Sequence, residues 1–326
     1  MFSSESTETF QARKLSMTNK EAISFLSDDL EMPDFQVKMQ QHKLNTLNNI
    51  LGRFKRIVPG GNVSVLTENN DNYVQDERQF LVKVKNDILS HRGGHCFWFS
   101  SFLSALLAHI GYKVGLVGAN DRSLDSIYNV HAAIIVFDLL YPGSKHLLEA
   151  SPTYPIFEAV RLPLKGEEDV YLSRYGGRKH KFVNAGGDII KYCHLLEKGE
   201  RPRTDWSDVI SEHDGLWEVD MEYHTASCIP LSYITENAFL VTAFPTIISF
   251  NHRNLFLRGF SQGKWVLIFN QRVTLRDEKG FLLEKLRASS SSDVVNFVTT
   301  YFPQFSPEEI EKGWDKKQAF DLSCRW

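Results

Sequence analysis

The strongest constraint on the fold is a glycine turn that runs directly into a long apolar segment. Gly93 and Gly94 are followed by Cys96, and after the cysteine apolar side chains recur every three or four residues. That spacing places them on one wide face of a helix, and Gly111 stands where a glycine commonly ends one. The segment therefore predicts a buried helix that begins at about Cys96 and ends just before Gly111.

Cys96 would then occupy the first turn of this helix. Backbone N–H groups without a helical partner and the positive end of the helix dipole both point toward such a position. They favour the thiolate, the form in which cysteine acts as a nucleophile. A lone cysteine in an apolar segment is often only a small core residue, and this alternative stays open.

The composition is that of an ordinary globular protein and argues against several function classes. The 326 residues, 42% of them hydrophobic and 24% charged, suffice for two or three domains with a sizeable core. A net charge of −3 gives no electrostatic basis for binding nucleic acid. No cysteine pair has the spacing of metal ligands, so no metal site is expected; the cysteines are Cys96, Cys193, Cys228 and Cys324.

The sequence gives no indication of a membrane partner. It has no stretch of about 18 apolar residues that could form a transmembrane helix. Residues 1–14 are rich in Ser, Thr and Glu and lack the apolar core of a secretory signal. Together with the low cysteine content, these features predict a reducing, cytoplasmic location.

The first third of the chain predicts helices. Apolar positions recur at helical spacing in a segment that starts at Asn19, in 35–54 with Asp34 as N-cap, in 76–89, and after Cys96. Between the second and third of these, Pro59-Gly60-Gly61-Asn62 is typical of a turn.

Beyond Tyr112, short β-branched and apolar runs predict antiparallel strands. Two more helices then close the chain, 292–301 and one that starts at Pro307 with Ser306 as its N-cap. The predicted fold class is therefore α+β. The expected strands are 113–117, 132–137, 147–150, 217–223, 239–250, 254–258, 264–269 and 271–276.

A cysteine nucleophile needs a base and a group that orients this base. His131 opens an apolar strand 35 residues after Cys96, and the returning strand ends in Glu149. Because the far ends of paired strands are neighbours, Glu149 returns to about the level of His131. The three residues would then form a Cys–His–carboxylate triad. Spacing alone favours the alternatives, an exposed histidine and an ordinary surface carboxylate.

One motif adds to this hypothesis. Arg92-Gly93-Gly94-His95-Cys96 resembles the Arg-Gly-Gly-x-Cys signature of arylamine N-acetyltransferases. The resemblance extends along nearly the whole chain, because a Pro-x-x-Asn segment precedes the motif, and a strand-opening histidine and a carboxylate on the returning strand follow it. In this chain they are Pro59-Gly60-Gly61-Asn62, His131 and Glu149.

The resemblance implies a fold and an activity. The fold is a helical bundle (1–112), a central antiparallel β-barrel (113–228) and a C-terminal α/β lid (229–326), with a cysteine-proteinase-like core. The activity is ping-pong transfer of an acetyl or other short acyl group from CoA, through a Cys96 thioester, to an aromatic amine or hydrazine. His131 and Glu149 complete the triad. Acetyl-CoA or another acyl-CoA is a co-substrate, and no tightly bound cofactor is expected.

The chain also departs from the family pattern. Glu149 replaces the usual aspartate, and residues 150–153, Ala-Ser-Pro-Thr, replace an x-Gly-x-Gly run. Gly60 and Gly61 replace Phe-Glu, while Trp98 and Ser100 replace a polar pair. The chain is therefore interpreted as a divergent member, and individual CoA-binding residues are not assigned.

Two other interpretations remain open at this point. The same triad serves cysteine hydrolases such as papain-like proteases and transglutaminases, although none of their signatures surrounds Cys96. The altered segment 150–153 also fits an amide synthase of natural-product biosynthesis or a catalytically impaired relative. Labelled acetyl-CoA distinguishes the transferase from the hydrolase, because only the transferase retains the acetyl group on Cys96.

Overall fold

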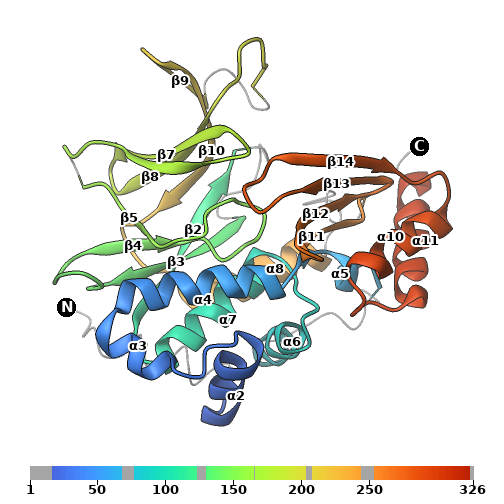
Figure 1. Ribbon diagram of the computed structural model, residues 1–326, viewed down its shortest axis with the longest axis horizontal. Helices are drawn as coiled ribbons and strands as arrows, with labels where there is room; N and C mark the ends of the chain where they lie inside the picture. The colour runs from blue at the N-terminus through green and yellow to red at the C-terminus, as the bar shows by residue number, and fades with distance from the viewer. Residues whose placement is uncertain are drawn as a thin grey trace.

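The computed structural model describes residues 17–67, 77–122, 130–164, 166–202, 208–243 and 253–323. A layer of helices lies beneath a nine-stranded antiparallel sheet, and a five-stranded sheet stands beside both, with α10 and α11 at its outer end (Figure 1). The α+β class predicted from the sequence is confirmed. The boundaries of the three predicted domains stay a prediction.

Apart from α5, which packs on the core of the five-stranded sheet, the helices of the first third surround one apolar core, which includes Phe25, Phe54 and Phe102. One prediction is wrong: the expected helix 35–54 is interrupted at His42, whose extended backbone (φ −145°, ψ 67°) separates α3 from α4. These helices are α2 (Asn19–Ser24), η1 (Phe25–Asp29), α3 (Phe35–Gln41), α4 (Lys43–Ile57), α5 (Val63–Thr67), α6 (Glu77–Leu89) and α7 (Cys96–His109).

The nine-stranded sheet curls into a nearly closed barrel. Its strand order is β5-β4-β3-β2-β10-β8-β7-β6, with β9 paired to β10. Inside, apolar side chains of β2, β3 and β4 meet the rings of Phe182, Tyr192 and Tyr223. The strands are β2 (Lys113–Asp121), β3 (His131–Phe137), β4 (Lys145–Leu148), β5 (Val160–Arg161), β6 (Val170–Tyr175), β7 (Arg178–Gly186), β8 (Ile189–Leu195), β9 (Val209–Glu212) and β10 (Gly215–His224).

The five-stranded sheet has its own apolar core, against which α10 (Ser291–Tyr301) and α11 (Pro307–Ser323) pack. Ser306 and Glu309 cap the start of α11 reciprocally, as its sequence predicts. Its strands, in order across the sheet, are β1 (Gly60–Gly61), β11 (Phe256–Ser261), β12 (Lys264–Phe269), β13 (Arg272–Arg276) and β14 (Leu282–Arg287).

Three local predictions differ from the structure. The turn expected at Pro59–Asn62 contains β1, because the Asn62 side chain bonds the backbone of Asn254 and Phe256 and holds Gly60–Gly61 against β11. Strands β5 to β9 and β14 are not among the individually expected strands. Residues 239–243, expected in a strand, end the helix α8 (Leu231–Ala243), because an uninterrupted apolar run fits either element. Residues 244–250 of that expected strand lie outside the described part.

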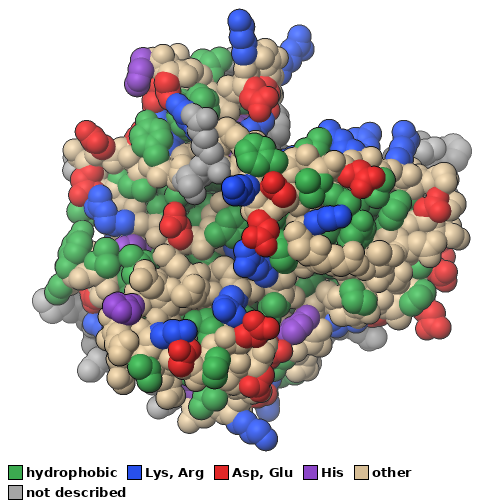
Figure 2. Space-filling view, viewed as in Figure 1, with side chains coloured by type: hydrophobic (Ala, Val, Ile, Leu, Met, Phe, Trp, Pro, Cys, Tyr) green, Lys and Arg blue, Asp and Glu red, His purple; other side chains and the backbone are tan. Residues whose placement is uncertain are grey.

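Acidic and basic side chains are interspersed over the face of the molecule seen in Figure 2, without a region of a single sign. Among the described residues, no helix has the length and apolar character needed to cross a membrane.

His146 is a buried polar residue of β4 and opposes Arg161 of β5. Neither of its ring nitrogens has a hydrogen-bond partner among the described residues. Burial, and then the charge of Arg161, lower the pKa of His146 below the ordinary value of 6.5. The His146 ring therefore binds a proton more readily in the unfolded chain than in the folded protein. As a result, the free energy of unfolding falls as pH drops below about 6.5.

We predict that His146→Leu flattens this acid dependence. Urea unfolding from pH 7.5 to 5 should show that the variant loses less stability than the wild type over the lower part of the range. Two curves that stay parallel would mean that His146 contributes nothing to the acid loss of stability.

Candidate active site

A close backbone approach fixes the turn in front of Cys96. Gly93 has φ +72°, and a Cβ atom there would lie 1.6 Å from the carbonyl oxygen of Pro59. Only glycine fits this position. His95 is extended and accepts the first backbone hydrogen bonds of α7, so Cys96 is the first helical residue, as predicted.

Two side chains hold α7 in place, and both belong to the positions that depart from the family pattern. The Ser100 hydroxyl donates to the carbonyl oxygen of Ala132 at 2.6 Å, next to His131 on β3. The Trp98 indole N–H donates to the Asp87 carboxylate of α6 at 3.0 Å. Trp98 and Ser100 therefore tie the cysteine helix to β3 and α6.

The structure brings the three predicted residues together. The His131 Nε2 and Glu149 Oε2 atoms lie 2.8 Å apart, and both side chains are buried. Since an ionised carboxylate only accepts, Nε2 donates this bond and Nδ1 is left for the thiol. Cys96 is partly exposed; its Sγ atom lies 3.7 Å from the carbonyl oxygen of Val130, the residue before His131, and the Cys96 side chain is close enough to His131 to raise the pKa of the imidazole.

The register of the sheet explains this meeting. Ile134 of β3 opposes Leu148 of β4, so Glu149, directly after β4, continues toward the start of β3. On one face of an antiparallel pair, diagonal neighbours two residues apart remain within reach of long side chains. The extra methylene of glutamate is therefore compatible with a normal hydrogen bond to His131.

The buried histidine carries a strongly shifted pKa. Burial alone would lower the pKa of His131, but the Glu149 carboxylate and the charged form of Cys96 raise it well above 6.5. The site therefore favours the imidazolium form of His131, which lies between the Glu149 carboxylate and Cys96.

Glu149 is fully buried and stays ionised because several groups compensate its charge. Burial alone would raise the pKa of Glu149; His131, then the Lys55 ammonium and the Ser151 N–H, lower it. Ser151 N lies 3.0 Å from Glu149 Oε1, and the Tyr223 hydroxyl donates to Oε2 at 2.9 Å. Glu149 thus accepts from three donors.

Two of these groups, Tyr223 and Lys55, are not predicted as site residues from the sequence. Tyr223 lies on a correctly predicted strand, β10, but its long-range contact with Glu149 left no local signal. Lys55 does leave a local signal in the sequence. It stands four residues after Leu51 on the apolar stripe of α4, where a charged side chain is unusual.

Two departures from the family pattern touch each other. A Cβ atom on Gly60 would lie 2.9 Å from Cγ of Pro152, closer than real Cβ atoms approach other groups. Gly60 forms a bridge with Gly94, just before Cys96, while Pro152 belongs to the segment after Glu149. The proline is therefore accommodated by the absence of a side chain at residue 60.

We predict that Gly60→Ala lowers the free energy of unfolding by about 1–3 kcal/mol, the usual effect of overpacking. In a Pro152→Ala background the same change should cost much less, since the ring that it meets is gone. Chemical denaturation of the two single variants, the double variant and the wild type measures this coupling. Additive effects would show that the two positions are independent.

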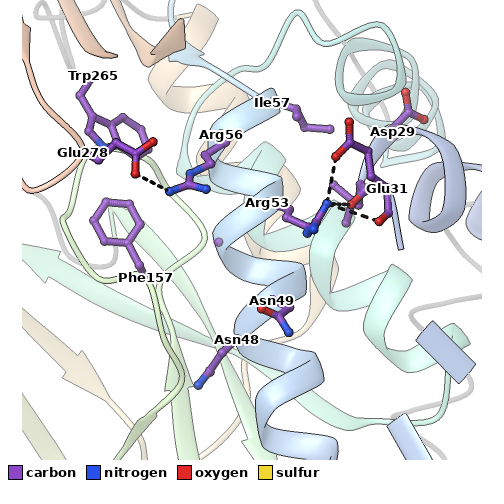
Figure 3. A pocket seen from close by; sticks show the side chains of 12 residues that line it. Asp29, Glu31, Asn48, Asn49, Arg53, Arg56, Ile57, Phe157, Trp265 and Glu278 are labelled. Atoms are coloured by element: carbon purple, nitrogen blue, oxygen red, sulfur yellow. Dashed lines mark hydrogen bonds and ion pairs between the residues drawn. The ribbon is translucent and has the colours of Figure 1, made fainter. Parts of the chain in front are cut away.

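A separate pocket of about 600 Å³ opens on the outer face of α4 (Figure 3). None of the three triad residues lines it. The Phe157 and Trp265 rings face each other there, and its two arginines pair with acids of the same pocket, Arg53 with Glu31 at 3.2 Å and Arg56 with Glu278 at 3.5 Å. Both arginines are therefore compensated within the pocket, while Asp29, its third acid, lies 3.0 Å from His91 outside it. No cluster of metal-ligating side chains occurs among the described residues.

Comparisons with known proteins agree with the geometry. A family model described as N-acetyltransferase matches residues 43–129, which contain Cys96. A comparison with curated protein sequences gave no match.

Among solved structures, the arylamine N-acetyltransferase from Mycobacterium abscessus is 12% identical, with a TM-score of 0.68 over 94% of this chain and 97% of that one. The enzyme from Salmonella typhimurium is 13% identical, with a TM-score of 0.68 over 92% and 99%. The Mycobacterium marinum enzyme in complex with CoA is 14% identical, with a TM-score of 0.65 over 90% and 98%. These matches agree with the resemblance inferred from the Arg-Gly-Gly-x-Cys motif, confirm the α+β fold with its antiparallel barrel, and support an acyltransferase.

Proposed function

We propose that this chain, a divergent relative of arylamine N-acetyltransferases, is an acyl-CoA-dependent N-acyltransferase that uses Cys96, His131 and Glu149 as its triad. The observation that carries the proposal is the buried contact of 2.8 Å between His131 and Glu149 beside a cysteine at a helix start. Acetyl-CoA, or another short acyl-CoA, is the donor, and an aromatic amine or hydrazine is the acceptor.

The first half-reaction acylates the cysteine. The Cys96 thiolate attacks the thioester carbonyl of acetyl-CoA, a new C–S bond forms, and the bond to the CoA sulfur breaks. CoA leaves as a thiolate and receives the proton of the His131 imidazolium. Glu149 holds the imidazole ring in orientation and stabilises its positive charge whenever His131 is protonated. Because one thioester replaces another, the acyl group keeps its reactivity.

The second half-reaction releases the product. The amine nitrogen attacks the Cys96 thioester and transfers a proton to His131, now neutral. The C–S bond then breaks, the Cys96 thiolate is restored, and the cycle closes with the imidazolium in place. No redox step or further co-reactant is needed.

We predict that mixing the protein with acetyl-CoA adds the mass of one acetyl group, lost in Cys96→Ala. The matched control is Cys228→Ala, because Cys228 is exposed and should not carry the acyl group. Intact-mass spectrometry gives the answer, and peptide mapping locates the adduct. An adduct that an aromatic amine removes, with formation of the amide, would support both half-reactions.

If acetyl-CoA gives no adduct, the same measurement with malonyl-CoA and propionyl-CoA tests for a different donor. The absence of any adduct with all three would contradict the proposed function. Rapid CoA release without amine and without a stable adduct would favour a hydrolase instead.

We predict that Glu149→Gln slows acylation of Cys96 by roughly two to four orders of magnitude, the usual contribution of general acid–base catalysis. The amide has no charge to hold the imidazolium, so the pKa of His131 should also fall. Glu158→Gln is the matched control, since Glu158 is exposed on the same segment. Rapid-quench acylation and the NMR titration of His131 measure the two effects, and a variant with normal acylation would exclude Glu149 from the triad.

A further inference from the structure

Lys55 of α4 is a buried cation without a carboxylate at ion-pair distance among the described residues. Its side chain is 0% exposed. The ammonium donates to the carbonyl oxygens of Tyr154 at 3.0 Å and Ile156 at 2.6 Å, and lies 5.2 Å from the Phe157 ring centroid. An unpaired buried charge is expensive, so a lysine here requires a compensating group farther away.

Another buried lysine shows how a buried ammonium charge is usually compensated. Lys181 of β7 is also 0% exposed, but it is bonded to the carboxylates of Asp169, at 2.9 Å, and Glu212. The charge of Lys181 is therefore compensated by carboxylates in direct contact with it. Among the described residues, the Lys55 ammonium has only carbonyl oxygens at hydrogen-bond distance, so its role differs from that of a local ion pair.

The anion that compensates Lys55 is the triad acid. Two charged groups act on the ammonium besides its burial: the Glu149 carboxylate after β4 and the Arg258 guanidinium of β11. Burial, opposed by Glu149 and assisted by Arg258, lowers the pKa of Lys55 to about 7. In return, the ammonium lowers the pKa of Glu149. Lys55 is thus charged below neutral pH and linked electrostatically to the triad.

The backbone that Lys55 binds is also part of the site. Ser151 N–H holds Glu149, and three residues later the Tyr154 ring stands edge-on to the His131 ring, with centroids 5.5 Å apart. The Tyr154 hydroxyl donates to Asp121 of β2 at 3.0 Å. Through its bond to the Tyr154 carbonyl oxygen, Lys55 therefore holds the segment that contacts both His131 and Glu149.

We propose that Lys55 is a positioning residue of the triad: its ammonium anchors the segment after Glu149 at the carbonyls of Tyr154 and Ile156 and neutralises the buried Glu149 carboxylate. This inference rests on the proposed function, since it assigns Lys55 to the same site. It predicts that the reactivity of Cys96 depends on a charge that does not touch the substrate.

The sign of the effect follows from simple electrostatics. Removal of a positive charge raises the pKa of every neighbouring group that titrates, whichever of Cys96, His131 and Glu149 holds the proton. The reactivity of Cys96 falls toward low pH because the coupled groups take up protons, and this part of the pH profile is called the acid limb. Without the charge of Lys55, the acid limb must move to higher pH. Lys55→Arg keeps the charge and should leave the limb nearly unchanged.

The test is the pH dependence of Cys96 alkylation by iodoacetamide, followed by mass spectrometry of the Cys96 peptide. This reaction needs no acyl donor, so it is informative even if the proposed function fails. The variants are Lys55→Met, Lys55→Gln, which keeps a donor for one carbonyl, and Lys55→Arg. Lys181→Met controls for the loss of a buried lysine, and thermal unfolding shows which variants fold.

We expect the acid limb to shift upward by about one pH unit in Lys55→Met and Lys55→Gln, which means roughly tenfold slower alkylation below the limb. Lys55→Arg and Lys181→Met should titrate like the wild type. If the two neutral variants lose thermal stability but keep the wild-type limb, Lys55 is only a structural anchor and the proposal is wrong. If Lys55→Met does not fold, the acid limb of Lys55→Gln is compared with that of Lys55→Arg. Equal limbs in these two variants would contradict the proposal.

Discussion

The hydrogen bond between His131 and Glu149 is the interaction on which the rest of the site depends. It places a carboxylate with no exposed surface in the interior, where an ionised group survives only if other groups compensate its charge. The surrounding structure supplies that compensation with the Tyr223 hydroxyl and the Ser151 N–H. Strands β3, β4 and β10, and the segment after β4, are thus joined at one carboxylate, and their packing orients the base beside Cys96.

The positions that depart from the family pattern each have a partner near this site. A longer acid, Glu149, still makes a normal contact with His131, and Pro152 in the following segment occupies the space that a side chain at Gly60 would need. The altered residues after the cysteine also have partners, because Trp98 and Ser100 connect α7 to α6 and β3. The changed positions therefore pack around the place where Cys96, His131 and Glu149 meet.

Local patterns in the sequence, with the family resemblance, predicted much of the fold and the meeting of Cys96, His131 and Glu149. The glycine turn and the apolar spacing after Cys96 fixed the start of α7, and strand pairing brought Glu149 back toward His131. Long-range contacts left weaker signals, so the role of Tyr223 could not be predicted, and neither could the pairing of Gly60–Gly61 with β11. The apolar run of residues 239–243 had no period that distinguishes a strand from the helix observed.

The most direct test of a covalent ping-pong mechanism is isotope exchange in the absence of an acceptor amine. Acetyl-CoA is mixed with labelled free CoA and the protein, and the label in acetyl-CoA is followed with time. Transfer through a Cys96 thioester predicts exchange with the wild type and none with Cys96→Ala. If acetyl-, malonyl- and propionyl-CoA all fail to exchange while the folded protein is intact, the arrangement of Cys96, His131 and Glu149 does not serve acyl transfer from CoA.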